Sequence, residues 1–280
     1  MKTIKNIDYS ITFACYNAIE YTKKCIDSMI KNGDDLSRLA IVDNGSTDGT
    51  QAYLQSLPLG DLILNQSNLG CGVAWNQGAL SLQSEWTIIM NNDVVVSPGW
   101  IENLINSAID NNIKVMSPAL IEGELDYDFD SFVAKATSKL EGYIRINDKH
   151  AVCLAVHKSV WNEIGYFQAA PRLLGYEDTI FFNELDKAGI ITATTGSSWL
   201  HHYGSITQSI MKKERGLLNK EGLAFRYNSS LLKQSWVKRK MNKISKKHQQ
   251  KKWMKHEISE FDISLHGIRN NHKFEWSHLL

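Results

Sequence analysis

The sequence predicts an α/β fold in which a mostly parallel sheet is flanked by helices. Over residues 9–109, short apolar stretches of strand length alternate with stretches of helical periodicity. Several strand-like stretches end abruptly in polar residues; the clearest is residues 85–93 (EWTIIMNND). A chain of 280 residues with 43% hydrophobic and 22% charged residues can also bury a sizeable core.

The elements of the first half follow in order from these patterns. The stretch 9–15 is rich in β-branched and aromatic residues and predicts a strand. Apolar residues then recur at helical spacing over 19–30, and Gly33 ends that helix. The further elements expected here are strands at 39–42, 61–64 and 86–90 and helices at 51–57, 72–82 and 98–109, with Pro98 in the first turn of the last. Parallel strands share a carboxyl edge, so we expect Asp43 and Asp93 on the same rim of the sheet.

The second half is less regular. We expect loops or an irregular hairpin at 122–150, a strand at 151–156, helices at 158–164 and 177–187, and a strand at 190–194. Residues 198–204, which include His201 and His202, are expected to form a loop. Residues 1–210 would then form one domain, with halves at about 1–118 and about 119–210.

A basic helical extension is predicted at 211–280. Residues 233–255 contain many Lys and Arg residues and no acid, and apolar residues recur at helical spacing at Leu232, Trp236, Met241 and Ile244. Two hypotheses stay open. The extension is either a solvated, partly frayed helix, or a segment that lies on an anionic membrane with Trp236 and Trp253 at the interface. In the second case, a chain ending near Ser230 should stay folded and lose liposome binding.

Other features narrow the class of protein. The formal net charge of +1 argues against a general nucleic-acid binder. The four cysteines are scattered without a Cys-x-x-Cys pair, which predicts reduced thiols. We recognise no signal peptide and no apolar run of about 20 residues, so we expect a cytoplasmic protein, with the inner face of the membrane as its candidate surface. Trp75 stands where a dinucleotide fingerprint needs a small residue, so a nicotinamide enzyme is not expected.

Two groups of polar residues suggest chemistry. Asp93 with one histidine would suit Mg²⁺ or Mn²⁺, with substrate phosphates completing the metal's coordination. Asp178, near a helix start, could serve as a general base. Each feature also has an ordinary structural explanation: Asp43 as a turn residue, Glu177 and Asp178 as acids favoured at a helix start, and histidines as polar surface.

Taken together and in order, these residues resemble a family 2 glycosyltransferase of the GT-A fold, in the bacterial branch that builds cell-surface polysaccharides and includes rhamnosyltransferase-like members. The resemblance covers about residues 10–204, and it implies that residues 1–210 form a catalytic domain with a donor-binding half at about 1–118 and an acceptor half at about 119–210. It rests on residues 12–17 (TFACYN), 41–50 (IVDNGSTDGT), Asn68 and Gly70 with Asn76 and Gly78, 90–93 (MNND), 175–178 (GYED), and His201-His202.

The resemblance implies a role for each matching position. Ala14, Tyr16 and Asn17 would flank the nucleotide, and Asp43 would contact a uracil or thymine base and the ribose. Asn68, Gly70 and Asn76 would surround the nucleotide and its phosphates, and Asn92 and Asp93 would belong to the metal-binding motif. Asp178, next to Glu177, would be the catalytic base. Asp93 and His201 would bind the metal, with His202 close enough to replace His201.

The resemblance also implies substrates. We expect an inverting, metal-dependent transferase that moves a sugar from a UDP- or dTDP-linked donor to a glycan or lipid-linked oligosaccharide. The motif departs from its usual form at Asn91, where a carboxylate is expected, which weakens the case for tight metal binding without the donor. Two alternatives are a catalytically inactive nucleotide-sugar-binding subunit of a membrane assembly, and a nucleotidyltransferase. The second lacks a Gly-rich triphosphate loop.

Overall fold

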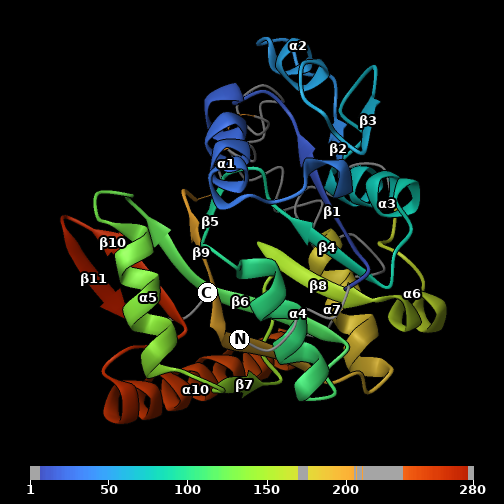
Figure 1. The fold of residues 1–280 in the computed structure, drawn as a ribbon. Helices are drawn as coiled ribbons and strands as arrows, with labels where there is room; N and C mark the ends of the chain where they lie inside the picture. Colours follow the sequence, from blue (N-terminus) through green and yellow to red (C-terminus); the bar gives the residue numbers. More distant parts are fainter. Residues whose placement is uncertain (1–6, 170–175, 205, 207–209, 211–235, 277–280) are drawn as a thin grey trace.

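The computed structural model describes residues 7–169, 176–204, 206, 210 and 236–276 (Figure 1). Within these residues the strands belong to one curled sheet, and helices pack against it. The α/β fold expected from the sequence is therefore confirmed. In the described part of the chain, no helix combines the length and the apolar character needed to span a membrane.

The first half is a parallel sheet with helices in its connections. Its elements are β1 (Tyr9–Cys15), α1 (Ile19–Asn32), a short 3-10 helix (Leu36–Arg38), β2 (Leu39–Asp43), α2 (Thr50–Gln55), β3 (Asp61–Leu64), α3 (Cys71–Ser81) and β4 (Trp86–Met90). β1 lies between β2 and β4 and is parallel to both. Cys15 pairs with Asp43, and Phe13 pairs with Met90, so these strands end at one edge of the sheet.

The second half makes the sheet mixed. Its elements are β5 (Val94–Val96), α4 (Trp100–Asp110), β6 (Val115–Gly123), α5 (Phe129–Lys139), β7 (Ile144–Ile146), β8 (Cys153–His157), α6 (Lys158–Ile164), α7 (Glu177–Lys187) and β9 (Thr192–His202). β8 joins β4 to β6 and is antiparallel to both. β9 runs parallel to β6 and pairs antiparallel with β5 and β7. Pro98 precedes α4, which starts at Trp100 after Gly99 (φ 67°), so its predicted place in the first turn is wrong.

Alternation along β1 shows why helices cover both faces of the sheet. Ile11 and Phe13 belong to a buried cluster that includes residues of α1 and α4. Ala14 belongs to a second buried cluster, which includes residues of α3, α6 and α7. Successive side chains of a strand point to opposite faces, so both faces of this strand need an apolar cover.

Residues 122–150 contain more structure than the sequence predicts. They include α5 and β7 instead of only loops or an irregular hairpin. The side chain of Asp128 caps α5 by accepting a hydrogen bond from the backbone N–H of Ser131, and Phe129, Val133 and Ala136 are buried at helical spacing. Those signals are local, but the acidic and aromatic residues around them obscure the periodicity.

His201 and His202 lie in a strand and not in the predicted loop. They are the last residues of β9, where Val95 pairs with His201 and Val94 pairs with His202. The register between β6 and β9 shifts at Pro118/Ala119, so residues 196–198 of β9 have no partner in β6. This irregularity falls on Gly196-Ser197-Ser198, whose composition favours a turn and hides the strand.

The C-terminal segment is helical only in part. α10 (Trp236–Phe261) is followed by two strands, β10 (His266–Asn270) and β11 (Lys273–Trp276). β10 pairs in parallel with β6, so the described sheet has the order β11-β10-β6-β8-β4-β1-β2-β3. In Figure 1, α10 crosses below β7. The part of the segment that the structure describes is therefore built into the main sheet.

Candidate active site

A cavity of about 470 Å³ opens at the carboxyl edge of the parallel strands. Eight of the predicted site residues line it: Ala14, Tyr16, Asn68, Asn92, Asp93, Glu177, Asp178 and His202. Five others, all in the described part of the chain, do not line it: Asn17, Asp43, Gly70, Asn76 and His201. Hydrogen bonds tie Asn17, Asp43, Gly70, Asn76 and His201 to neighbouring segments instead.

Asp43 is fully buried at the end of β2 and shapes the loop that follows. Its Oδ1 accepts hydrogen bonds from the backbone N–H of Gly45 (3.1 Å) and Ser46 (2.9 Å) and from Gln51 Nε2 (2.8 Å). Its Oδ2 is buried without a hydrogen-bond partner among the described residues. A buried carboxylate oxygen without a partner is costly, so a donor group on a ligand would be stabilised there.

Asn17 connects two loops at this edge. It has positive φ (53°), its Oδ1 accepts from the backbone N–H of Thr47 (2.9 Å), and its own N–H donates to Ser46 Oγ (2.8 Å). The loop after β1 is thereby tied to the loop after β2. Asn17 supports the position of Tyr16, which does line the cavity.

The segment before α3 is organised in a similar way. Asn68 Oδ1 accepts from the backbone N–H of Gly70 (2.9 Å), and the carbonyl of Gly70 accepts from Asn44 Nδ2 (3.3 Å). Asn76 is engaged elsewhere: its side-chain amide donates to the carbonyl of Phe167 (2.8 Å) and accepts from the N–H of Phe167 (3.0 Å). Asn76 therefore fixes the chain near Phe167.

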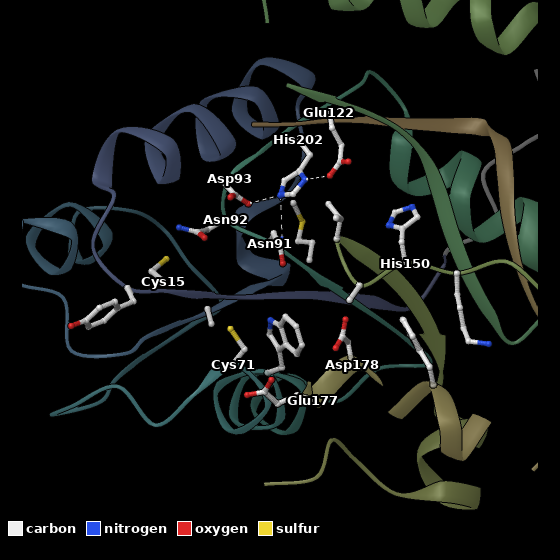
Figure 2. A pocket seen from close by; sticks show the side chains of 18 of the residues that line it. Cys15, Cys71, Asn91, Asn92, Asp93, Glu122, His150, Glu177, Asp178 and His202 are labelled. Carbon is white, nitrogen blue, oxygen red and sulfur yellow. Dashed lines mark hydrogen bonds and ion pairs between the residues drawn. The ribbon is translucent and has the colours of Figure 1, made fainter. Parts of the chain in front are cut away.

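A chain of charged and imidazole groups crosses one side of the cavity (Figure 2). His202 lies between two carboxylates, with Nε2 3.2 Å from Asp93 Oδ1 and Nδ1 3.0 Å from Glu122 Oε1. The other oxygen of Glu122 is 3.2 Å from Nε2 of His266, which is on β10. The sequence analysis missed Glu122 and His266. Glu122 sits near the end of β6, so the strand-end argument that selects Asp93 could have found it, but no local signal marks His266.

Burial and neighbouring charges shift the pKa values of His202 and Glu122 in opposite directions. Burial lowers the pKa of His202, but the hydrogen bonds and charges of Asp93 and Glu122 outweigh burial and raise this pKa to about 9. Burial raises the pKa of Glu122, whereas His202 and His266 hold it well below its usual range. His202 and Glu122 thus each favour the charged form of the other.

His201 points to the other face of β9 and does not join this chain. Its Nδ1 lies 3.0 Å from Tyr127 Oη and its Nε2 lies 3.1 Å from the carbonyl of Gly123. Burial lowers the pKa of His201 to about 4 and keeps the ring neutral at pH 7. Adjacent strand residues face opposite ways, so the structure brings His202, and not His201, to Asp93.

The geometry of Asp93 and His202 fits two ligands of one divalent cation. Two ligand atoms about 2.1 Å from an octahedral ion and at right angles are roughly 3.0 Å apart, and Asp93 Oδ1 and His202 Nε2 are 3.2 Å apart. Glu122 contacts the other ring nitrogen of His202, as carboxylates do for many metal-binding histidines. In the described residues, no three His, Cys, Asp or Glu side chains are arranged to hold an ion, so oxygens of a substrate would have to complete the coordination.

Asp178 enters the cavity from the first turn of α7 (Figure 2). Its Oδ1 accepts from the backbone N–H of Thr179 (2.6 Å). Burial raises the pKa of Asp178, and the positive charge of Lys246 is among the smaller, opposing effects. Glu177 is buried beside α3, where a Cβ on Gly72 would lie 2.9 Å from Glu177 Cγ, and its Oε2 accepts from the backbone N–H of Tyr176 (2.8 Å). Glu177 therefore packs α7 against α3, and Asp178 is the better placed base.

The remaining wall comes from residues that the sequence analysis did not select. Lys149 and His150 line the cavity after β7, and Lys246 and Gln250 line it from α10. Lys149 Nζ is ion-paired with Asp186 (2.6 Å). A C-terminal helix that lines the cavity could not be recognised from local patterns, because its position depends on tertiary packing.

Comparisons with known proteins identify relatives. The family model described as "Glycosyl transferase family 2" matches residues 10–165. A Mycobacterium tuberculosis protein named N-acetylglucosaminyl-diphospho-decaprenol L-rhamnosyltransferase is 28% identical over 202 residues, which cover 58% of this chain and 65% of the relative. A Rickettsia felis protein named uncharacterized glycosyltransferase is 29% identical over 99 residues, or 35% of this chain and 16% of the relative. The matched region thus spans less than two thirds of these relatives.

Two solved structures share the fold. A mannosyltransferase, PcManGT, from Pyrobaculum calidifontis in complex with GDP-Man and Mn²⁺ superposes with a TM-score of 0.55 at 14% identity, covering 81% of this chain and 66% of that chain. GalNAc-T7 with UDP, GalNAc and Mn²⁺ superposes with a TM-score of 0.54 at 13% identity, covering 71% and 44%. At these identities, the likeness establishes the fold.

Proposed function

Because the chain belongs to glycosyl transferase family 2, we propose that it transfers a sugar from a UDP- or dTDP-linked donor to a glycan or lipid-linked glycan, with inversion at the anomeric carbon. The observation that carries the proposal is that Asp178 and the pair Asp93–His202 line the same cavity. The first supplies a base, and the second supplies a place for a diphosphate and its cation.

The donor would lie along the carboxyl edge of the sheet. The unpartnered Oδ2 of Asp43 would accept a hydrogen bond from the base or ribose, consistent with its burial without a partner. Tyr16 and Asn68 would flank the nucleotide from the loops after β1 and before α3. These groups hold the donor in place and so reduce the entropic cost of reaction.

Asp178 and the pair Asp93–His202 would have separate tasks, one for the acceptor proton and one for the charge of the leaving diphosphate. Asp178 takes the proton of the acceptor hydroxyl as that oxygen attacks the anomeric carbon, and the sugar–phosphate bond breaks on the opposite side. Asp93 and His202 would hold Mn²⁺ or Mg²⁺, which when bound would neutralise charge on the departing diphosphate. The two solved structures of this fold contain Mn²⁺, which supports this choice of ion.

The acceptor would enter from the side of Asp178. The mycobacterial relative is named for a diphospho-decaprenol acceptor, which supports a lipid-linked substrate. We propose the inner face of the cytoplasmic membrane as the place of the reaction. From the sequence we expect residues 122–150 and 173–176 to shape the acceptor pocket, because they belong neither to the sheet nor to the donor motifs. Lys149 and His150 in the first segment line the cavity. Residues 173–175 lie outside the described residues.

Replacing Asp178 by Asn tests the central assignment. The amide keeps the shape of the side chain but cannot take a proton, so transfer should fall by about 10²–10⁴-fold, while UDP binding with Mn²⁺, measured by calorimetry, stays within about twofold. Glu184→Gln is the matched control, because Glu184 is a partly exposed acid on the same helix whose ion-pair partner among the described residues is Lys187, one turn away. Full turnover in Asp178→Asn would disprove the role of the base, and a transferase active without divalent metal would disprove the role of Asp93 and His202.

A further inference from the structure

Helix α10 presents one stripe of side chains to the body of the protein. Lys246, Gln250, Trp253 and Glu257 are spaced at i, i+4, i+7 and i+11, which places them on the same face of a helix. Lys246 and Gln250 line the cavity. Further along the stripe, Trp253 lies against Arg145, and Glu257 is completely buried. A single helix face thus runs from the core to the cavity wall.

The buried end of the stripe fixes the position of the helix. Glu257 accepts hydrogen bonds from Arg145 Nε (2.8 Å) and Nη2 (2.5 Å), from Ser264 Oγ (2.6 Å) and from the backbone N–H of Leu265 (3.1 Å). The guanidinium carbon of Arg145 lies 5.3 Å from the ring centroid of Trp253. Such a network, buried and fully hydrogen-bonded, specifies one register of the helix. The helix backbone at Lys246, three turns away, is therefore held beside the cavity, where the exposed lysine side chain lines the wall.

Lys246 brings a positive charge to the acceptor side of the cavity. It makes no ion pair within 4 Å with any described residue, whereas the charge of Lys149 is paired with Asp186. Lys246 and Asp178 line the same cavity, and the charge of Lys246 is one of the smaller effects that lower the pKa of Asp178 against its burial. The pair Asp93–His202, where we propose the cation, lies apart from Asp178, as Figure 2 shows.

We propose that Lys246, with Gln250 beside it, binds a phosphate group carried by the acceptor. This inference rests on the proposed function, because Asp178 is the group that meets the acceptor hydroxyl. Lys246 shares the cavity wall with Asp178, which would meet the acceptor, whereas the donor diphosphate would lie at Asp93. An ammonium group on a flexible stem suits phosphate as a point charge, and an amide one turn away adds a hydrogen-bond donor.

Binding of geranyl phosphate and of inorganic phosphate tests the proposal without any turnover. The full chain, with UDP and Mg²⁺ at saturation, is titrated by calorimetry as wild type, Lys246→Gln and Lys251→Gln. Lys251→Gln is the control, because Lys251 is an exposed lysine of the same helix and does not line the cavity. Losing one charge-assisted contact should weaken geranyl phosphate binding about tenfold in Lys246→Gln and leave Lys251→Gln unchanged.

The two probes distinguish the source of the phosphate. Tighter binding of geranyl phosphate than of inorganic phosphate, lost in Lys246→Gln, supports a lipid-linked phosphate. Equal binding of both probes, also lost in Lys246→Gln, supports a soluble phosphorylated acceptor. Unchanged binding in Lys246→Gln, an equal loss in Lys251→Gln, or no binding to wild type would overturn the proposal. A failure of Asp178→Asn to affect transfer would count against the base and leave these binding results standing.

Discussion

The position of each histidine in its strand decides which of the two belongs to the site. The sequence places His201 and His202 side by side, and their order along a strand gives them opposite environments. His201 is neutral among Tyr127 and a carbonyl group, whereas His202 is held between Asp93 and Glu122. The resemblance favours His201 as the metal ligand, and the geometry favours His202.

Glu122 should control the affinity of the cation site without touching the cation. Its carboxylate fixes the ring of His202 and is itself held by His266. Replacement by Gln removes the charge that orients the imidazole, so Mn²⁺ affinity in the presence of UDP should fall roughly 10–100-fold. Electron paramagnetic resonance of free Mn²⁺ measures this directly. Glu124→Gln, an exposed acid two residues later, is the control, and equal Mn²⁺ affinity in both variants would contradict the role of Glu122.

The elements recovered from the sequence share a property. Strands such as Tyr9–Cys15 and Asp61–Leu64, and helix Glu177–Lys187, are marked by local composition, periodicity and stop signals. The strand predicted at the start of β9 ends too early because Gly196 interrupts the pattern. The sequence does not predict β10, because its partner in β6 is over 140 residues away. Local patterns do not encode such pairings. Local motifs therefore predict Asp93 and Asp178 as site residues. They do not predict His266 and Lys246, which reach the site through tertiary packing.

The contact between α1 and α4 provides a pH-dependent test of packing. Asp34, just after α1, accepts a hydrogen bond from Trp100 Nε1 (2.9 Å). Burial raises the pKa of Asp34 to about 6, although the hydrogen bond from Trp100 acts in the opposite direction. The folded state therefore binds this proton more tightly than the unfolded state, so the contribution of Asp34 to stability declines as pH rises from about 4 to above 6.

Asp34→Asn should isolate that contribution. The amide oxygen can still accept from Trp100, but there is no charge to bury. Below pH 4 the free energies of unfolding should match, and above pH 6 the variant should be more stable by on the order of 1 kcal/mol, allowing for solvent screening at this half-buried site. Urea unfolding at several pH values measures the difference. A difference that does not vary with pH would contradict the assignment.

At the scale of the whole molecule, the C-terminal segment changes from an appendage to a structural part. β10 covers the edge of β6, and Ile263 and Leu265 are buried in a cluster with Trp199. Ending the chain near Ser230 would uncover that edge and remove Glu257 from Arg145, so that this buried guanidinium would lose one of its two carboxylate partners and keep Asp148. The expectation that such a chain stays folded is therefore not supported, and membrane binding is better tested by point substitutions.

Suitable point substitutions lie on the outward face of α10. Met241 and Ile244 are 64% and 60% exposed among lysines on the described part of the helix, a combination suited to an anionic lipid surface. Reversing the charges of Lys251 and Lys255 in the full chain should reduce co-sedimentation with phosphatidylglycerol vesicles at least tenfold, since each lysine near such a surface contributes about 1 kcal/mol. Lys114→Glu with Lys158→Glu changes the net charge equally on exposed residues of other elements and should bind as wild type. Equal loss in both double variants would indicate nonspecific charge attraction, and no loss in either would exclude α10 as the lipid-binding surface.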